Sequence, residues 1–205
     1  SLGKERDENL IALMPGSRQM EWKCIAPKIA EATRIIQKQK PDMRFVAVVP
    51  KGASRQVQKY FSDICTVTEG SAAKVLLQSQ AAIVKSGTIT LEAAVCDTPQ
   101  VLVYDVPPLL RAQWVLTGLG KRVPFVGMPN IIAGRGIIPE FIGPGCQASV
   151  IAKEVLLLLN DPDRRVRMKR DYAEVRRALG SELPIAATER TVQMLEEMLQ
   201  NEPRA

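Results

Sequence analysis

The sequence predicts a doubly wound, Rossmann-like α/β fold, in which helices cover both faces of a parallel sheet. Short apolar runs alternate along the chain with longer segments whose apolar residues recur at helical spacing. The runs are nearly continuous in Val, Ile, Ala and Leu, which is typical of strands buried on both faces of a parallel sheet. Such strands are joined by right-handed crossover connections.

The elements follow one another in a regular order. The expected strands are residues 9–15, 44–50, 65–69, 81–84 and 100–105. The helices expected after them are residues 21–40, 54–61, 72–79, 88–96 and 108–119. In the first helix, Ile25, Ile29 and Ala32 lie at helical spacing, and Pro41 ends it.

The rest of the chain is expected to be helical after an irregular segment. Residues 123–143 are apolar but rich in glycine and proline, and helices are expected over residues 147–160, 163–179 and 184–200. We therefore expect a Rossmann-like domain over residues 1–180. We expect residues 181–205 to form a carboxyl-terminal helix that packs on this domain or crosses to another domain or chain.

Composition limits the classes of function. With 205 residues and 46% hydrophobic residues, the chain can bury one sizeable core. No apolar run is long enough to span a membrane and the first ten residues are polar, so we expect a soluble, cytoplasmic protein. The chain begins with Ser1 rather than Met, which suggests a processed form or a fragment.

The cysteines and the missing histidine exclude several kinds of site. The four cysteines have neither paired nor metal-ligand spacing, which favours free thiols in a reducing compartment; they are Cys24, Cys65, Cys96 and Cys146. The sequence contains no histidine, so it holds no His-containing triad and no His-based zinc site. We expect no metal site.

The net charge of +6 comes largely from residues 161–180. Acidic residues are mixed into this basic segment and aromatic residues do not interleave it, which argues against nucleic-acid binding. A solvated helix face is the main interpretation. Contact with an anionic membrane surface, at the inner face of a membrane, stays open as an alternative.

Three expected strand ends carry polar turns, and parallel α/β sheets bind ligands at such ends. The turns are residues 15–18, 86–88 and 128–135. Ser86, Gly87 and Thr88 precede a helix, whose free amides and dipole suit a phosphate, although an ordinary capped turn has the same sequence.

Four more residues near these turns have a functional and a structural interpretation. Arg18 can pair with a diphosphate or be a surface arginine. Glu92, one helical turn after the cap, can accept both hydroxyls of a ribose or stabilise the helix dipole. Asn130 and Arg135 flank a glycine-containing loop that either binds a ligand or is only a tight turn.

Three motifs together resemble a known family. "LMPGSR" (residues 13–18), "SGTITLEAA" (residues 86–94) and especially "MPNIIAGRGIIPEFI" (residues 128–142) resemble the carboxyl-terminal half of lipid-A-disaccharide synthase, an inverting GT-B glycosyltransferase family. The resemblance extends over about residues 10–179. The Pro-Asn-x-x-Ala-Gly-Arg segment is specific, whereas several GT-B families share the Ser-Gly-Thr turn and its glutamate.

The resemblance implies a binding site for a UDP-sugar donor and no cofactor. It places Ser86, Gly87 and Thr88 near the diphosphate and Glu92 on the ribose. By the same resemblance, Arg18 and Asn130 match positions that are important for activity in the family. Arg135 is a weaker candidate. The full enzyme would transfer an acylated glucosamine from UDP to an acylated glucosamine phosphate, forming a β-linked disaccharide.

The chain departs from the family pattern in its extent and at two positions. The family's amino-terminal domain, with the catalytic aspartate and the site for the lipid-linked acceptor, is not in this sequence, so we expect no catalytic residue here. Asp105 and Gly136 stand where the pattern has other residues. Two other functions stay open: another GT-B transferase or epimerase, and a non-catalytic UDP-binding module. A homodimer that forms through the apolar stripe of residues 188–200 also stays open.

Overall fold

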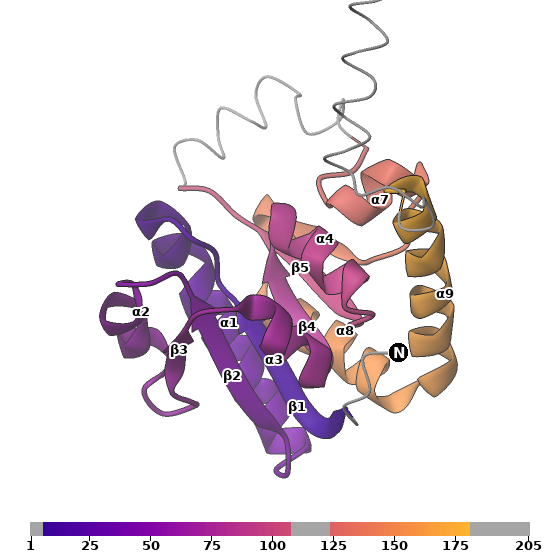
Figure 1. Cartoon of the computed structure of the whole chain (residues 1–205). Coiled ribbons are helices and arrows are strands. Elements are labelled where there is room, and N and C mark those ends of the chain that lie inside the picture. The colour runs from indigo at the N-terminus through magenta and orange to yellow at the C-terminus, as the bar shows by residue number, and fades with distance from the viewer. Residues whose placement is uncertain (1–5, 108–123, 181–205) are drawn as a thin grey trace, which may run out of the picture.

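The computed structural model describes residues 6–107 and 124–180, and a six-stranded parallel sheet forms its centre (Figure 1). The strands are β1 (Asp7–Met14), β2 (Arg44–Val49), β3 (Val67–Glu69), β4 (Ser79–Lys85), β5 (Gln100–Tyr104) and β6 (Glu140–Ile142). Their order is β3-β2-β1-β4-β5-β6, so the chain runs outward in both directions from the central pair β1 and β4. This order confirms the doubly wound, Rossmann-like fold.

Helices cover both faces of the sheet. They are α1 (Gln19–Gln39), α2 (Ser54–Phe61), α3 (Ala72–Gln78), α4 (Thr88–Val95), α7 (Met128–Ala133), α8 (Ala148–Asn160) and α9 (Pro162–Ala178), with a short 3-10 helix η1 (Gly143–Gly145). Helices α3 and α4 lie in front of the sheet in Figure 1, and α1 packs against α8 behind it. Helix α9 contacts α4, α7 and α8.

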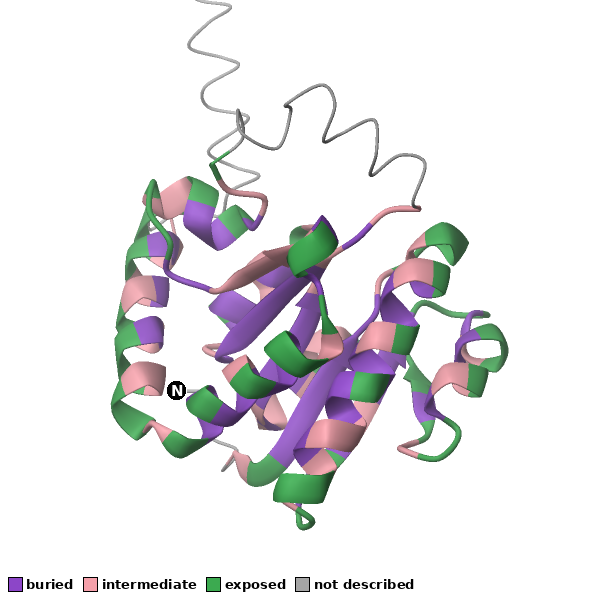
Figure 2. Ribbon diagram, turned by 180° about the vertical axis from the view of Figure 1, so that it is seen from behind, coloured by how far each residue is buried: buried purple, intermediate pink, exposed green. Residues whose placement is uncertain are grey.

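The core follows the apolar pattern of the sequence. The central strands are purple, the colour of buried residues, along most of their length in Figure 2. Ile11 and Leu13 of β1 and Ile83 of β4 are fully buried. Helix α1 buries Ile25 and Ile29 against the sheet, and burial of such side chains stabilises the fold by roughly 1.5–3 kcal/mol each.

The irregular segment contains two elements that the sequence analysis did not predict, α7 and β6. Pro129 occupies the first turn of α7, where proline is tolerated, and Gly134 ends the helix in the left-handed conformation at φ 64°. Both elements are too short to produce a hydrophobic period. The glycine and proline content of the segment therefore predicted an irregular structure instead. Strand β6 pairs with β5 and extends the sheet.

Some expectations fall outside the described residues: the helices over residues 108–119 and 184–200, and the separate segment 181–205. None of the helices that the structure describes is both long and apolar enough to cross a membrane.

Candidate functional site

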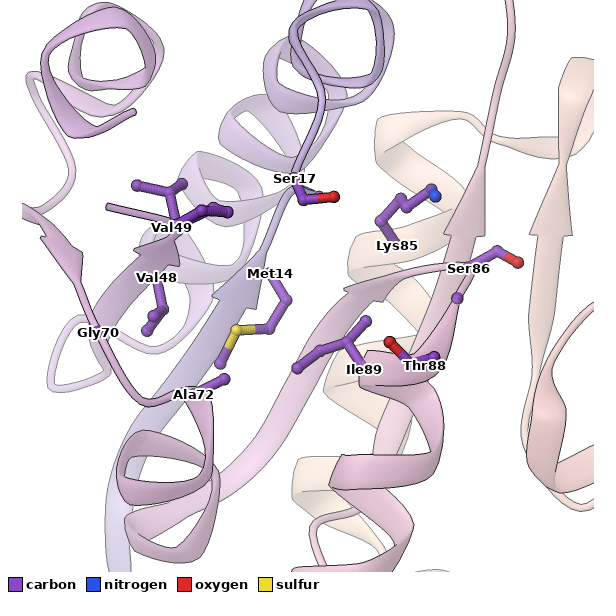
Figure 3. Close-up of a pocket in the computed structure, with 13 residues that line it drawn as sticks. Met14, Ser17, Val48, Val49, Gly70, Ala72, Lys85, Ser86, Thr88 and Ile89 are labelled. Carbon is purple, nitrogen blue, oxygen red and sulfur yellow. The ribbon is translucent and has the colours of Figure 1, made fainter. Parts of the chain in front are cut away.

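A cleft of about 370 Å³ opens at the carboxyl edge of the sheet, beyond the ends of β1, β2 and β4 (Figure 3). Strands β1 and β4 are the pair from which the chain runs outward, the place at which α/β sheets bind ligands. Met14 of β1 and Ile89 of α4 form part of its apolar wall. Residues 85–89 form the wall that leads from β4 into α4.

Gly87 gives the turn between β4 and α4 its shape. Its backbone has φ 143° and ψ −166°, a conformation that is essentially restricted to glycine. Helix α4 begins immediately afterwards at Thr88. Within the part of the chain that the structure describes, the amides of Gly87, Thr88 and Ile89 donate no hydrogen bond. The positive end of α4 therefore presents three open donors at the cleft.

Ser86 has a different position from the two residues after it. Its hydroxyl donates to the carbonyl of Val126 (3.2 Å) and its amide donates to the carbonyl of Val103 (3.1 Å). In Figure 3 its side chain extends away from the cleft, whereas Thr88 lies at the cleft wall beside Ile89. Ser86 thus fixes the turn to neighbouring segments, and Gly87 and Thr88 offer the donors.

The turn after β1 is closed by Glu21, a residue that the sequence analysis missed. The Glu21 carboxylate accepts hydrogen bonds from the amides of Ser17 (3.0 Å) and Arg18 (3.1 Å). It also forms an ion pair with Lys85 at the end of β4 (2.7 Å). The spacing of Glu21, three residues after the residue that precedes α1, is a capping pattern and was the available signal.

The charge of Glu21 is stabilised by these contacts. Burial works to raise the pKa of Glu21, but hydrogen bonds from Lys85 and from the amides of Arg18 and Ser17 outweigh it and lower the pKa below its ordinary value. Arg18 itself is at the rim. Its side chain is 82% exposed, with the guanidinium 3.8 Å from Glu21.

Glu92 lies one helical turn after Thr88 on α4 and is half-buried. No side-chain hydrogen bond holds its carboxylate among residues 6–107 and 124–180. It is therefore available on the helix whose first amides face the cleft.

Asn130 is buried in α7 and acts within the protein. Its side-chain oxygen accepts from the amides of Ile137 (2.7 Å) and Ile138 (2.8 Å). Its side-chain nitrogen donates to the carbonyl of Ile138 (2.9 Å) and to Glu140 (2.7 Å). An asparagine amide has two donor hydrogens and two acceptor positions, so these four bonds use its full capacity.

Glu140 extends this arrangement to the start of α7. Its carboxylate accepts from the amides of Val126 (3.0 Å) and Gly127 (2.9 Å). A β carbon on Gly127 would lie 2.8 Å from a terminal methyl carbon of Leu102 and 2.9 Å from a carboxylate oxygen of Glu140, so both side chains would have to move to admit it. We call Asn130 and Glu140 the loop bracket, because together they hold residues 126–138.

Arg135 lies outside the cleft wall. Its guanidinium binds Asp171 (3.0 Å) and Glu174 (2.6 Å) of α9. The hydrogen bond with Asp171 is the main cause of the raised pKa of Arg135. Among the seven sequence-predicted site residues, the structure brings Ser86, Gly87 and Thr88 to the cleft. It places Arg18 immediately before α1 and Glu92 one turn into α4. Asn130 and Arg135 are engaged elsewhere.

No group of three His, Cys, Asp or Glu residues is arranged to hold a metal ion among the described residues.

Comparison with known sequences gives consistent matches. The family model described as lipid-A-disaccharide synthetase matches residues 1–195. The lipid-A-disaccharide synthase of Paraburkholderia phytofirmans is 32% identical over 204 residues, which cover 96% of this chain and 51% of that protein. The enzyme of the same name from a Synechocystis strain is 35% identical over 189 residues, covering 87% of this chain and 46% of that protein. The chain thus spans about half the length of the curated relatives that it matches.

Solved structures share the fold at low identity. The pneumococcal O-GlcNAc transferase GtfA in complex with UDP and GlcNAc has a TM-score of 0.63 at 13% identity, covering 96% of this chain and 37% of that chain. The UDP-GlcNAc 2-epimerase from Neisseria meningitidis bound to UDP-GlcNAc has a TM-score of 0.58 at 14% identity, covering 94% of this chain and 45% of that chain. At such identities the likeness shows the fold alone.

Proposed function

Because the chain belongs to the lipid-A-disaccharide synthetase family, we propose that it forms the donor-binding half of a two-domain GT-B glycosyltransferase. The donor is a UDP-linked acylated glucosamine. The whole enzyme transfers this sugar to an acylated glucosamine phosphate, so that a β-linked disaccharide forms and UDP leaves. The name that the relatives carry supports this reaction.

The open start of α4 is the observation that carries the proposal. Three amides that have no partner among the described residues, at the positive end of a helix and in a cleft, are suited to the oxygens of a diphosphate. Gly87 and Thr88 supply two of these donors, and Ser86 holds the turn in place. Glu92, further along the same helix, accepts the ribose hydroxyls, and Arg18 approaches the phosphates from the exposed rim.

The same groups support departure of the nucleotide. Negative charge develops on UDP as the bond between the sugar and the phosphate breaks. Preorganised amides and the dipole of α4 stabilise that charge without needing to reorient. Arg18 adds a positive charge at the rim. The catalytic base and the site for the lipid-linked acceptor belong to the amino-terminal half of the enzyme.

Asn130 and Arg135 contribute indirectly in this proposal. The loop bracket holds residues 126–138, and Ser86 is hydrogen-bonded to the carbonyl of Val126 in the same segment. Asn130 therefore supports the turn that binds the diphosphate through the bracket. Arg135 fastens the following loop to α9 through its two carboxylate partners.

In this proposal, contact with a membrane and formation of a homodimer are properties of the whole enzyme. On α9, Arg164 and Arg176 pair with Glu154 and Asp97, which fits a solvated charged face. Arg170 and Arg177 are exposed on the same helix and would provide the peripheral contact with an anionic membrane. A homodimer would use the stripe in residues 188–200.

Calorimetry of the 205-residue chain with UDP, CMP and ADP tests the proposed function. We expect weak binding with a preference for UDP, because half of a two-domain cleft leaves the sugar open to water. A preference for ADP, or no UDP binding at millimolar concentration, would contradict it. In the enzyme with both halves, turnover of plain UDP-sugars in place of acylated donors would favour another UDP-sugar transferase or an epimerase.

A further inference from the structure

Lys85, the last residue of β4, contributes the only charged side chain to the cleft wall among the described residues. Its ammonium nitrogen lies 3.8 Å from the position that a β carbon would take on Gly87. The positive charge therefore lies next to the turn whose amides are open. The side chain is only 16% exposed, so water screens this charge less than it screens the charge of Arg18.

Glu21 fixes the position of this ammonium group. One carboxylate oxygen accepts from Lys85, and the other accepts from the amides of Ser17 and Arg18 at the start of α1. Through Glu21 the lysine is thus connected to the backbone of the turn that follows the neighbouring strand β1. A lysine side chain that is already ordered loses less conformational entropy when a ligand binds.

Lys85 still has capacity for another acceptor. An ammonium group has three donor hydrogens, and Glu21 is its one hydrogen-bonding partner within the described residues. A diphosphate at the start of α4 would also approach the carboxylate of Glu21. Two anions at such a distance repel each other unless a cation lies between them.

We propose that Lys85 binds a phosphate group of the nucleotide diphosphate directly, and that Glu21 is its positioning residue. This inference rests on the proposed function and names a cation for the diphosphate that the motifs did not indicate. Lys85 acts together with the amides of Gly87, Thr88 and Ile89, while Arg18 remains at the rim.

Titration of UDP, uridine and inorganic pyrophosphate into the full chain, compared with Lys85→Met, tests the proposal. Methionine keeps the apolar stem but lacks the charge. We expect UDP and pyrophosphate to bind about 10- to 100-fold more weakly to the variant, the effect of one charge-assisted hydrogen bond, with uridine unchanged. Lys153→Met on α8, an exposed position outside the cleft, is the matched control and should bind all three as the original chain does.

A double variant, Lys85→Met with Glu21→Gln, separates direct contact from charge cancellation. We expect its affinity for UDP to stay low, because the phosphate still lacks its ammonium partner. Full recovery of affinity would mean that Lys85 only cancels the charge of Glu21, and would overturn the proposal. Unchanged UDP affinity in Lys85→Met would overturn it while leaving the proposed function standing.

Two further outcomes keep the inference distinct from the proposed function. Suppose that pyrophosphate binding depends on Lys85, but that the chain does not bind uridine and does not prefer UDP over pyrophosphate. This result would support a phosphate contact of Lys85 and contradict the assignment of the ligand as a nucleotide. If Lys85→Met does not fold, acetylation of lysines in the original chain gives the answer. UDP or pyrophosphate should then protect Lys85 and not Lys153, and equal reaction of Lys85 with and without either ligand would overturn the proposal.

Discussion

The loop bracket and the start of α4 use their backbone amides in opposite ways. In the segment held by the bracket, the amides of Val126, Gly127, Ile137 and Ile138 all donate to side-chain oxygens of Asn130 or Glu140. At the start of α4, three consecutive amides donate to no described residue. The first arrangement stabilises a loop, and the second leaves donors for a ligand.

This difference separates two effects of substitution. Residues whose polar groups are already paired inside the protein should affect stability first, because their loss leaves buried groups without partners. Residues around open donors should affect binding first, and should affect stability less than the residues of the loop bracket do. Both sets lie in motifs that resemble the same family, so their shared appearance in sequence does not imply a shared role.

The largest expected effect is that of Asn130→Ala. It leaves two amides and one carbonyl of residues 137–138 without partners, at about 1–3 kcal/mol each, so we expect a loss of about 4 kcal/mol in the free energy of unfolding. Urea denaturation measures it. Asn9→Ala, at an exposed position on β1, is the matched control and should change stability by less than about 0.5 kcal/mol. Normal stability combined with lost UDP binding would instead make Asn130 a direct ligand contact.

Gly87→Ala should combine a smaller loss of stability with a clear loss of binding. A β carbon in this backbone conformation costs about 1–3 kcal/mol, and relief of the strain would turn the amides of Thr88 and Ile89 away from the cleft. Gly145→Ala is the control, since the space around Gly145 is open and its φ is not in the left-handed range. Denaturation and UDP calorimetry are read together. Equal affinity for UDP in the two variants would remove Gly87 from the binding site.

Arg18 and Glu92 should separate the two parts of the nucleotide. Arg18→Ala should weaken UDP by about 1.5 kcal/mol, at the low end for a charge-assisted contact because the side chain is exposed, and leave uridine nearly unchanged. Glu92→Ala should weaken UDP and uridine alike, because both contain the ribose. Calorimetry with both ligands measures this. If Arg18→Ala left UDP affinity unaltered, the assignment of Arg18 to the diphosphate would be wrong.

Glu21 extends the comparison to the turn before α1, where the amides of Ser17 and Arg18 are already occupied by its carboxylate. Because the folded pKa of Glu21 lies below its ordinary value of 4.5, its contribution to stability is complete above that value and is lost as pH falls through the folded pKa. We therefore expect Glu21→Gln to reduce the dependence of the unfolding midpoint on pH below about 4.5. Thermal unfolding between pH 7 and pH 3 measures it, and an identical acid slope in both proteins would contradict this assignment.

The sequence was sufficient for the sheet and for the positions of its polar turns. Continuous apolar strands and helical spacing define β1, β2, β4 and β5, and Ser86, Gly87 and Thr88 could be placed before a helix. Sequence patterns do not show where each polar group finds its partner, because those partners are distant along the chain. Lys85 is 64 residues from Glu21, and Arg135 is 36 residues from Asp171. The elements α7 and β6 are too short to produce a hydrophobic period, so the sequence did not predict the structure of the segment that contains Asn130.

The central claim is that the open amides of α4 receive the diphosphate. Backbone amide NMR of the ¹⁵N-labelled chain, titrated separately with UDP and with uridine, tests it most directly. We predict that the shifts induced by UDP but not by uridine concentrate on Gly87, Thr88 and Ile89, while the amides of Ile137 and Ile138 stay nearly unchanged. A diphosphate-dependent shift centred on Ile137 and Ile138, with none at the start of α4, would contradict the account.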